Sequence, residues 1–221
     1  MYYFKSLRRL SAILLSAAIC LPSLAQDKPD KKKDEKPAGA PSEADMAAMM
    51  ELSKPGENHK LLASGVGKWS YSVKMWMNPD PNAPPTTSTG TSVVKPVMDG
   101  RYFTSEHTGK MQMPGPDGKM TDTEFKGMSI DGYDNVKKKF VASWIDNMGT
   151  GIMLSEGDYD AATKTFTYRT EGEMMPGMKT KIREVIKIVD NDHHTFEFFE
   201  ERGEKEVKTM EINYTRSGGS R

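Results

Sequence analysis

The chain has 221 residues, a length that fits one domain with appendages, and its 31 basic residues balance its 31 acidic residues. A nucleic-acid-binding protein would normally show a basic excess or a basic stripe, so this balance argues against that class. The single cysteine, Cys20, lies in an N-terminal apolar segment, and removal of that segment would leave no thiol for disulfides, thiolate metal sites or nucleophilic catalysis.

Residues 1–25 show the order of features found in a secretory signal peptide. Three basic residues, Lys5, Arg8 and Arg9, precede an apolar stretch that is shorter than the about 20 residues of a membrane span. A small-x-small cleavage site follows and ends at Ala25. We therefore predict a cleaved signal peptide, a periplasmic or extracellular location, and no membrane span in the mature protein.

Two features of the N-terminal region concern how the folded domain is attached: a candidate lipid anchor and a charged segment that follows it. Cys20 offers an alternative to cleavage after Ala25, namely a lipoprotein anchor, but Ile19 stands where lipoprotein processing favours a small residue. Residues 26–41 consist mainly of lysine, aspartate and proline, and such a segment cannot bury enough apolar surface to offset its ordering entropy. We predict a disordered charged linker over these residues.

Residues 42–64 are predicted to form a short helical segment before the main domain. Ser42 precedes Asp45 by three positions, as in a capping box, and apolar side chains follow at helical spacing until Lys54. These side chains are Met46, Met49 and Met50. A second short helix carries Leu61 and Leu62, and we expect both apolar faces to pack across an end of a barrel. Alternatively, the first helix recruits a partner, which would make the chain an envelope scaffold module.

From Gly67 onward the apolar period changes from helical to two, which indicates β-strands. Short turns rich in Asp, Asn and Gly separate these strands, a pattern typical of a sandwich or an up-and-down barrel. The predicted strands are Gly67–Met77, Thr87–Val94, Arg101–Lys110, Thr123–Ile130, Phe140–Asp146, Gly151–Tyr159, Thr165–Glu173, Lys181–Val189, Thr195–Glu201 and Glu206–Thr215. Because closure removes sheet edges, we predict an all-β fold over residues 65–216, a closed antiparallel up-and-down barrel of about eight to ten strands. The long connections over residues 78–86 and 111–121 should hang over one mouth, and residues 217–221 should form a flexible tail.

The start of the first predicted strand, Gly67-Lys68-Trp69, resembles the Gly-x-Trp motif of the lipocalins. In that superfamily an arginine near the end of the last strand lies over the tryptophan, and Arg216 stands at the matching place here. The resemblance implies that Gly67, Trp69 and Arg216 close one end of the barrel. A cation over an indole face is worth about 0.5–2 kcal/mol.

A wider set of motifs follows in order along the predicted strands. The motifs are Asp99-Gly100-Arg101-Tyr102, Gly132-Tyr133-Asp134-Asn135, Trp144-Ile145-Asp146, Ser155-Glu156-Gly157-Asp158-Tyr159-Asp160 and Glu211-Ile212-Asn213-Tyr214-Thr215-Arg216. In this order they resemble one bacterial family, the domain of unknown function DUF1579. The resemblance runs from about Gly56 to Arg216 and implies an antiparallel calycin-like barrel with no established reaction.

Inward residues of the predicted strands are the candidate ligand contacts. By the period of two, His107 shares a strand face with Arg101 and Phe103. If this face points inward, Arg101 and His107 are buried polar groups that need partners, and if it points outward they are solvated. Trp144 and Asp146 also share a face, and they either give a ligand an aromatic wall and one acceptor or serve as core and turn cap.

From these candidates we predict that the barrel holds a small, largely apolar ligand. The ligand-binding residues would be Arg101, Phe103, His107, Trp144 and Asp146. The sequence has no Gly-x-Ser-x-Gly elbow and no His-Glu-x-x-His pair, so we assign no catalytic residue, no cofactor and no metal. An enzyme with His107 or a buried glutamate as its base is an alternative. The sequence carries no signal for an oligomeric state.

Other polar candidates are expected at the surface. Adjacent residues of an extended chain point to opposite faces, so His193 and His194 make a poor chelate and are predicted to be surface residues. Glu124, Glu184 and Glu211 lie within predicted strands and are expected to be exposed, because a glutamate is rarely buried.

The chain is rich in methionine, with 17 residues of this type. One cluster pairs Met111 with Met113 on a strand face, and another gathers Met174, Met175 and Met178 around a turn. Thioethers select Cu(I), so a copper-binding protein is an alternative function. Because no histidine is close in sequence to either cluster, we instead expect these side chains to serve as adaptable packing.

Overall fold

We describe the fold from a computed structural model, which defines residues 41–77, 83–115 and 119–218. The predicted signal peptide, nearly all of the predicted linker and the end of the predicted tail lie outside the described residues. So do residues 78–82 and 116–118, which belong to the two predicted long connections.

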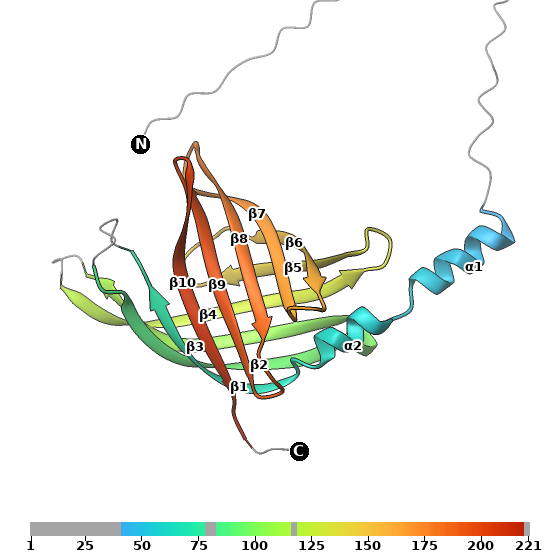
Figure 1. The fold of residues 1–221 in the computed structure, drawn as a ribbon, viewed down its shortest axis with the longest axis horizontal. Coiled ribbons are helices and arrows are strands. Elements are labelled where there is room, and N and C mark those ends of the chain that lie inside the picture. Colours follow the sequence, from blue (N-terminus) through green and yellow to red (C-terminus); the bar gives the residue numbers. More distant parts are fainter. Residues whose placement is uncertain (1–40, 78–82, 116–118, 219–221) are drawn as a thin grey trace, which may run out of the picture. The chain divides into compact units, whose positions relative to one another are not determined.

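Within the described residues, ten antiparallel strands follow one another around a single closed barrel (Figure 1). Their bounds are β1 (Gly67–Met75), β2 (Thr86–Val97), β3 (Tyr102–Pro114), β4 (Met120–Asp134), β5 (Lys139–Asp146), β6 (Met153–Asp160), β7 (Thr165–Met175), β8 (Met178–Ile188), β9 (His193–Arg202) and β10 (Lys205–Arg216). Each strand pairs with its neighbours in the sequence, and β10 returns to pair with β1. Trp69 thereby lies opposite Arg216 at one end of this seam, and Met75 lies opposite Met210 at the other. The prediction of a closed up-and-down barrel is confirmed.

The β3–β4 hairpin is longer than the sequence pattern predicted. Met113 pairs with Thr121, so most of the stretch predicted as a loop over residues 111–121 belongs to these strands, and that prediction is wrong there. The physical reason is that the alternation continues: Met111 and Met113 line the interior, while Gln112 donates a hydrogen bond to Asp122 on the exposed face. The hairpin therefore lengthens the barrel wall at this end.

The interior of the barrel follows from the alternation along each strand. Trp69, Tyr71 and Val73 of β1 are buried and the residues between them are exposed. They pack against Tyr214 of β10. A second buried cluster lies across the ring of strands and consists of Phe140, Phe166 and Tyr168. The two clusters occupy different walls and leave space between them.

Helix α1 (Glu43–Leu52) begins at the predicted capping box, in which Ser42 Oγ accepts from the Asp45 amide and the Asp45 carboxylate accepts from the Ser42 amide. None of its residues is buried. The expectation that its methionines pack on the barrel is therefore wrong, since all three are at least half exposed; these are Met46, Met49 and Met50. The C-terminal end of α1 is hydrogen-bonded to the barrel domain, because the Asn135 side-chain amide donates to the carbonyls of Leu52 and Lys54 at 2.8 and 2.9 Å.

Helix α2 (Glu57–Ala63) lies against one end of the barrel, as predicted (Figure 1). Leu61 and Leu62 pack against the cluster that contains Phe140. His59 anchors the start of the helix, because its Nδ1 accepts from the Gly56 amide at 3.0 Å. Neither described helix is long and apolar enough to cross a membrane.

Candidate functional site

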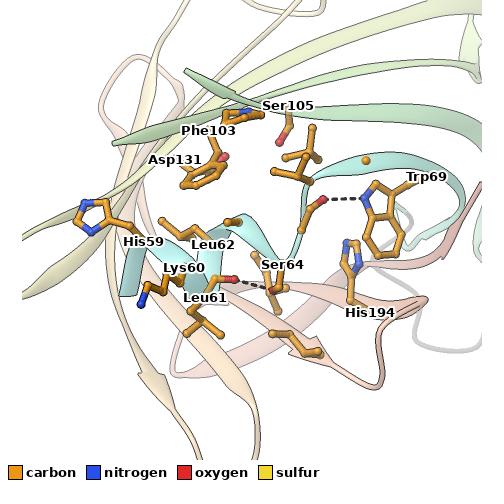
Figure 2. Close-up of a pocket in the computed structure, with 18 of the residues that line it drawn as sticks. His59, Lys60, Leu61, Leu62, Ser64, Trp69, Phe103, Ser105, Asp131 and His194 are labelled. Atoms are coloured by element: carbon orange, nitrogen blue, oxygen red, sulfur yellow. Dashed lines mark hydrogen bonds between the residues drawn. The ribbon is translucent and has the colours of Figure 1, made fainter. Parts of the chain in front are cut away.

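The barrel encloses a cavity of about 480 Å³, which we call the inner cavity. A second hollow of about 1250 Å³ lies between α2 and the adjacent end of the barrel. Figure 2 shows this hollow, with Phe103, Ser105 and Asp131 gathered on one side and Trp69 and His194 together on another. Seven residues line both spaces, and we call them the belt: Trp69, Val94, Ser105, Asp131, Tyr168, Ile186 and His194.

Trp69 and Arg216 lie together at the α2 end of the belt. The Arg216 guanidinium carbon is 4.1 Å from the centroid of the indole, which itself donates from Nε1 to the Gly65 carbonyl at 2.9 Å. Arg216 also donates to three carbonyls, those of Val66 (2.7 Å), Ser64 (3.0 Å) and Asn191 (2.9 Å). The structure thus brings both residues together with the turn between α2 and β1.

Gly67 makes room for this arrangement. Its φ of +141° lies in a region that side chains rarely adopt, and a Cβ built there would be 2.5 Å from Arg216 Nη1. A side chain at position 67 would therefore displace the guanidinium from its place over the indole.

His194 belongs to the interior, so the prediction that it is a surface residue is wrong. Its ring stacks on Tyr214 at 4.3 Å and meets the edge of Trp69 at 4.4 Å. Burial lowers the pKa of His194 to about 4, with smaller contributions from the positive charges of Arg216 and His107. His193 remains exposed and its Nδ1 lies 2.9 Å from Asp190 Oδ1, so the two histidines do point to opposite faces.

His107 of β3 lines the inner cavity, whereas Phe103 of the same strand is buried and lines the hollow beside α2. Its ring lies among three aromatic rings, with centroids at 5.2 Å from Trp144, 5.9 Å from Tyr71 and 6.2 Å from Tyr214. Burial lowers the pKa of His107 to about 4, so the ring is neutral at physiological pH. Among the described residues it has no hydrogen-bond partner, and because no buried side-chain nitrogen there is unsatisfied, its nitrogens face the cavity.

Arg101 stands apart from the other predicted ligand residues. It comes before the first residue of β3, directly after a short 3-10 turn over Met98–Gly100 that interrupts the alternation. Its Nη1 donates to the Met98 carbonyl at 3.3 Å and lies 3.5 Å from Asp99. Arg101 lines neither of the two spaces described above.

Trp144 and Asp146 lie together on β5 and both line the inner cavity. Asp146 Oδ2 accepts from the indole Nε1 at 2.8 Å, while its Oδ1 accepts from the Met148 amide at 2.9 Å. Asp146 therefore holds the indole and caps the following turn at once. Trp144 also crosses the bare backbone of Gly127 on β4, where a Cβ would overlap the indole ring.

Two carboxyl groups of the barrel interior were not predicted from the sequence: Glu184, which is buried, and Asp131, which is partly buried. Asp131 Oδ2 accepts from Ser129 Oγ at 2.5 Å, and Glu184 Oε2 accepts from Ser155 Oγ at 3.3 Å. Burial raises the pKa of Asp131 to about 6 against the lowering effect of Ser129. Burial also raises the pKa of Glu184 to about 7; Ser155 opposes this rise and the negative charge of Asp131 adds to it.

The expectation that Glu184 is exposed is therefore wrong, and a local signal for its burial exists. Glu184 stands between Ile182 and Ile186, which share its strand face, so an inward face carries all three. The expectation holds for Glu124, which is exposed. Glu211 is half-buried on the outer face, where Lys208 Nζ donates to it at 2.7 Å.

Methionines surround the end of the inner cavity farthest from α2. Seven of them line it: Met75, Met77, Met111, Met113, Met148, Met153 and Met210. Flexible thioethers suit a wall that adapts to ligands of different shape. No group of three or more His, Cys, Asp or Glu side chains able to hold a metal occurs in the described part of the chain.

Compared with known protein families, residues 54–216 match the family described as "Protein of unknown function (DUF1579)". The matched segment contains α2 and all ten strands and leaves out α1. Among curated proteins, no relative matches the chain.

Proposed function

The chain belongs to the DUF1579 family of proteins of unknown function, and from this premise we propose that it is an exported barrel that holds a small, largely apolar ligand. The observation that carries the proposal is the inner cavity of about 480 Å³. Small-molecule sites are typically concave, about 300–1,000 Å³ in volume, and mainly apolar with a few placed polar groups. Aromatic rings, methionines and aliphatic side chains make up most of the lining of this cavity, and polar side chains make up the rest.

The loose packing of the barrel interior supports a ligand site over a purely structural core. No described side chain keeps less than 2% of its surface accessible, although ten strands surround the interior. Protein cores normally pack as densely as organic crystals. About eight strands enclose an interior that side chains just fill or that holds one small ligand, as in lipocalins, and because the diameter grows with strand number, ten strands enclose more space.

Export is supported by the sequence, through the basic, apolar and cleavage features of residues 1–25. Mass spectrometry of the protein recovered from the cell envelope tests it directly. Cleavage as proposed yields a chain that starts at Gln26, whereas lipidation yields an acylated chain that starts at Cys20. A recovered chain that still starts at Met1 would contradict cleavage.

A cavity-filling variant tests ligand binding. Ala142 lines the inner cavity on β5, and Ala142→Phe should fill part of it. We expect the variant to bind the neutral apolar probe N-phenyl-1-naphthylamine at least about tenfold more weakly, because a filled pocket excludes the probe. Ile145→Phe on the exposed face of the same strand is the matched control and should bind as the wild type does. A folded Ala142→Phe variant with unchanged probe affinity would refute the site.

A scaffold function is the second candidate, and α1 favours it. The helix exposes Met46, Met49 and Met50 and lies outside the segment that matches the family. Exposed apolar side chains on one short element are typical of contact surfaces. Cross-linking in cells with the wild type and with a triple Met→Ser variant of these residues would separate the functions. Identical cross-linked partners would eliminate the scaffold version.

Copper binding is a third candidate, supported by the thioethers at the end of the inner cavity. Met111 and Met113 both line it, and soft sulfur ligands select Cu(I). Met178, in the other cluster, is exposed. A Cu(I) competition titration with a chromogenic chelator tests this candidate, and absence of competition by the protein would remove it.

Enzymatic activity is a fourth candidate, supported by Glu184. A carboxyl group with a pKa of about 7 beside a cavity can act as a general base at neutral pH. His107, with a pKa of about 4, is a weak base there. If the protein converts a ligand and neither Glu184→Gln nor His107→Ala changes the rate of that conversion, neither residue is the general base.

A further inference from the structure

We infer that the ligand carries a protonated amine on an apolar body and that Asp131 and Glu184 bind this amine; the inference rests on the proposed ligand-binding function. Both carboxyl groups line the inner cavity, one from β4 and the other from β8. The site would thus consist of two carboxyl groups that bind the cation and apolar side chains that contact the rest of the ligand.

The hydrogen bonds of the two carboxyl groups leave acceptor capacity free. Each group accepts one hydrogen bond from one serine, at a single oxygen. No buried side-chain oxygen in the described chain lacks a partner, so the second oxygen of each group keeps accessible surface. Inside the barrel this surface faces the cavity. An ammonium group has three donors and no acceptor, which fits the free oxygens.

The charges around the carboxyl groups favour a cation. The titratable groups that face the inner cavity are Tyr71, His107, Asp131, Asp146, Tyr168, Glu184, His194 and Tyr214, with Lys110 on β3. The tyrosines and the two histidines are neutral at pH 7, since burial raises the pKa of the former and lowers that of the latter. Lys110 is exposed and precedes Met111 at the methionine end of the cavity.

The cations at the α2 end do not neutralise the carboxyl groups either. Arg216 is engaged with Trp69 and three carbonyls, and it lies 3.4 Å from Asp192. Lys60 of α2 and Lys68 of β1 line only the hollow beside α2, where Lys60 pairs with Glu57 at 2.6 Å. His59 lines the same hollow, and burial lowers its pKa. The negative charge of Asp131 and Glu184 is therefore left for the ligand.

The position of the carboxyl groups also sets the orientation of the ligand. Asp131 belongs to the belt near α2, whereas the methionines lie at the far end of the barrel. Between them the wall is apolar and includes Tyr71, Val73 and Ile212. An amphipathic amine would place its head at the belt and its tail toward the methionines.

Displacement of N-phenyl-1-naphthylamine from the purified full chain tests the inference. Decylamine, decanol and decanoate have the same tail and differ in the charge of the head. A charge-assisted hydrogen bond to the carboxyl groups should favour the ammonium head, so at about pH 8 decylamine should displace the probe at roughly tenfold lower concentration than decanol. Decanoate should be the weakest competitor, because like charges repel.

Variants of the two carboxyl groups test whether these groups cause the preference for decylamine over decanol. In the double variant Asp131→Asn/Glu184→Gln, decylamine should lose its advantage over decanol to within about threefold. Glu156→Gln, on the exposed face of β6, is the control and should keep the full preference. If the double variant does not fold, the wild type still tests the inference: the preference for decylamine should fall as the pH drops from about 8 to about 5 and the carboxyl groups become protonated.

The outcomes separate the two proposals. If decanoate competes as well as decylamine, or if the folded double variant keeps the preference, the amine inference is overturned while binding of apolar ligands stands. If the wild type binds neither the probe nor any competitor, the proposed function fails and the amine inference fails with it.

Discussion

The Arg216 guanidinium lies 4.1 Å above the indole of Trp69, and the two residues are direct partners across the β1–β10 seam. This pair links the first and last strands, and the same guanidinium bonds the turn that follows α2. One side chain thus stabilises the closure of the barrel, the position of the indole and the docking of the helix.

Arg216→Lys should destabilise the protein although the charge is kept. A lysine cannot donate to three carbonyls in the geometry of a planar fork, and it loses contact with the indole. We expect the free energy of unfolding to fall by about 2–3 kcal/mol, measured by urea denaturation. Arg202→Lys is the control, because that guanidinium is exposed and pairs only with Glu200 among the described residues. Equal effects of the two substitutions would contradict the role of Arg216.

Gly127→Ala should displace the Trp144 indole. The added methyl would overlap the ring, which is rigid and held at Nε1 by Asp146. We expect a loss of about 1–3 kcal/mol in stability, as for overpacked cores, together with a shift in tryptophan emission. Gly149→Ala is the matched substitution, because its Cβ would meet no atom within 4 Å. An unchanged emission spectrum in Gly127→Ala would show that the indole does not rest on this glycine.

Glu184→Gln should stabilise the protein at high pH and not at low pH. Burial raises the pKa of Glu184 from 4.5 to about 7, so the folded chain binds this proton more tightly than the unfolded chain. The contribution of this group to stability is therefore fully present below about pH 4.5 and is lost as the pH rises through about 7. Asp131, with its pKa raised to about 6, acts in the same direction.

Urea unfolding of the wild type and Glu184→Gln across this pH range measures the effect. At about pH 8 the variant should be more stable by up to about 3 kcal/mol, and the difference should vanish near pH 4. Glu156→Gln, whose carboxylate is half exposed, should change stability by less than about 1 kcal/mol at either pH. A difference that does not depend on pH would mean that Glu184 titrates normally.

Leu62→Ala should loosen the α2 end of the barrel. Leu62 packs, partly buried, against the cluster of Phe140, Phe166 and Tyr168. Removing part of this contact should lower the free energy of unfolding by about 1–2 kcal/mol. Met49→Ala on the exposed α1 should have less than about 0.5 kcal/mol of effect. Similar losses in both variants would contradict the docking of α2.

The fold was predictable from the sequence because a period of two is clear in several strands, among them β1, β4 and β6. In Gly67–Met77, for example, apolar and polar side chains alternate, so the sequence alone predicts a strand with one apolar and one polar face. Motif resemblance pointed to the same barrel. The bounds were less accurate where proline and glycine interrupt the apolar pattern, as around Pro114, because a strand can end in proline without losing a required donor.

The polar part of the candidate site was less predictable, because alternation relates residues within a strand and does not say which set is inside. His194 and Glu184 were assigned to the surface on average residue preferences, although neighbours two positions away, Phe196 and Ile186, line the cavity. Arg101 was assigned to the face of His107, but a 3-10 turn shifts it out of that register. The α1 methionines were expected to be buried because of their apolar character, yet no barrel surface covers them.

The β1–β10 seam also constrains the order of folding. It joins residues far apart in the chain, such as Ser70 and Thr215, so the ring of strands cannot be completed until the last of them has been synthesised. Pairings between such distant segments form slowly, because the chain entropy lost in closing the loop precedes the gain from the contacts. A nascent chain therefore exposes the unpaired edge of β1 until β10 has been made.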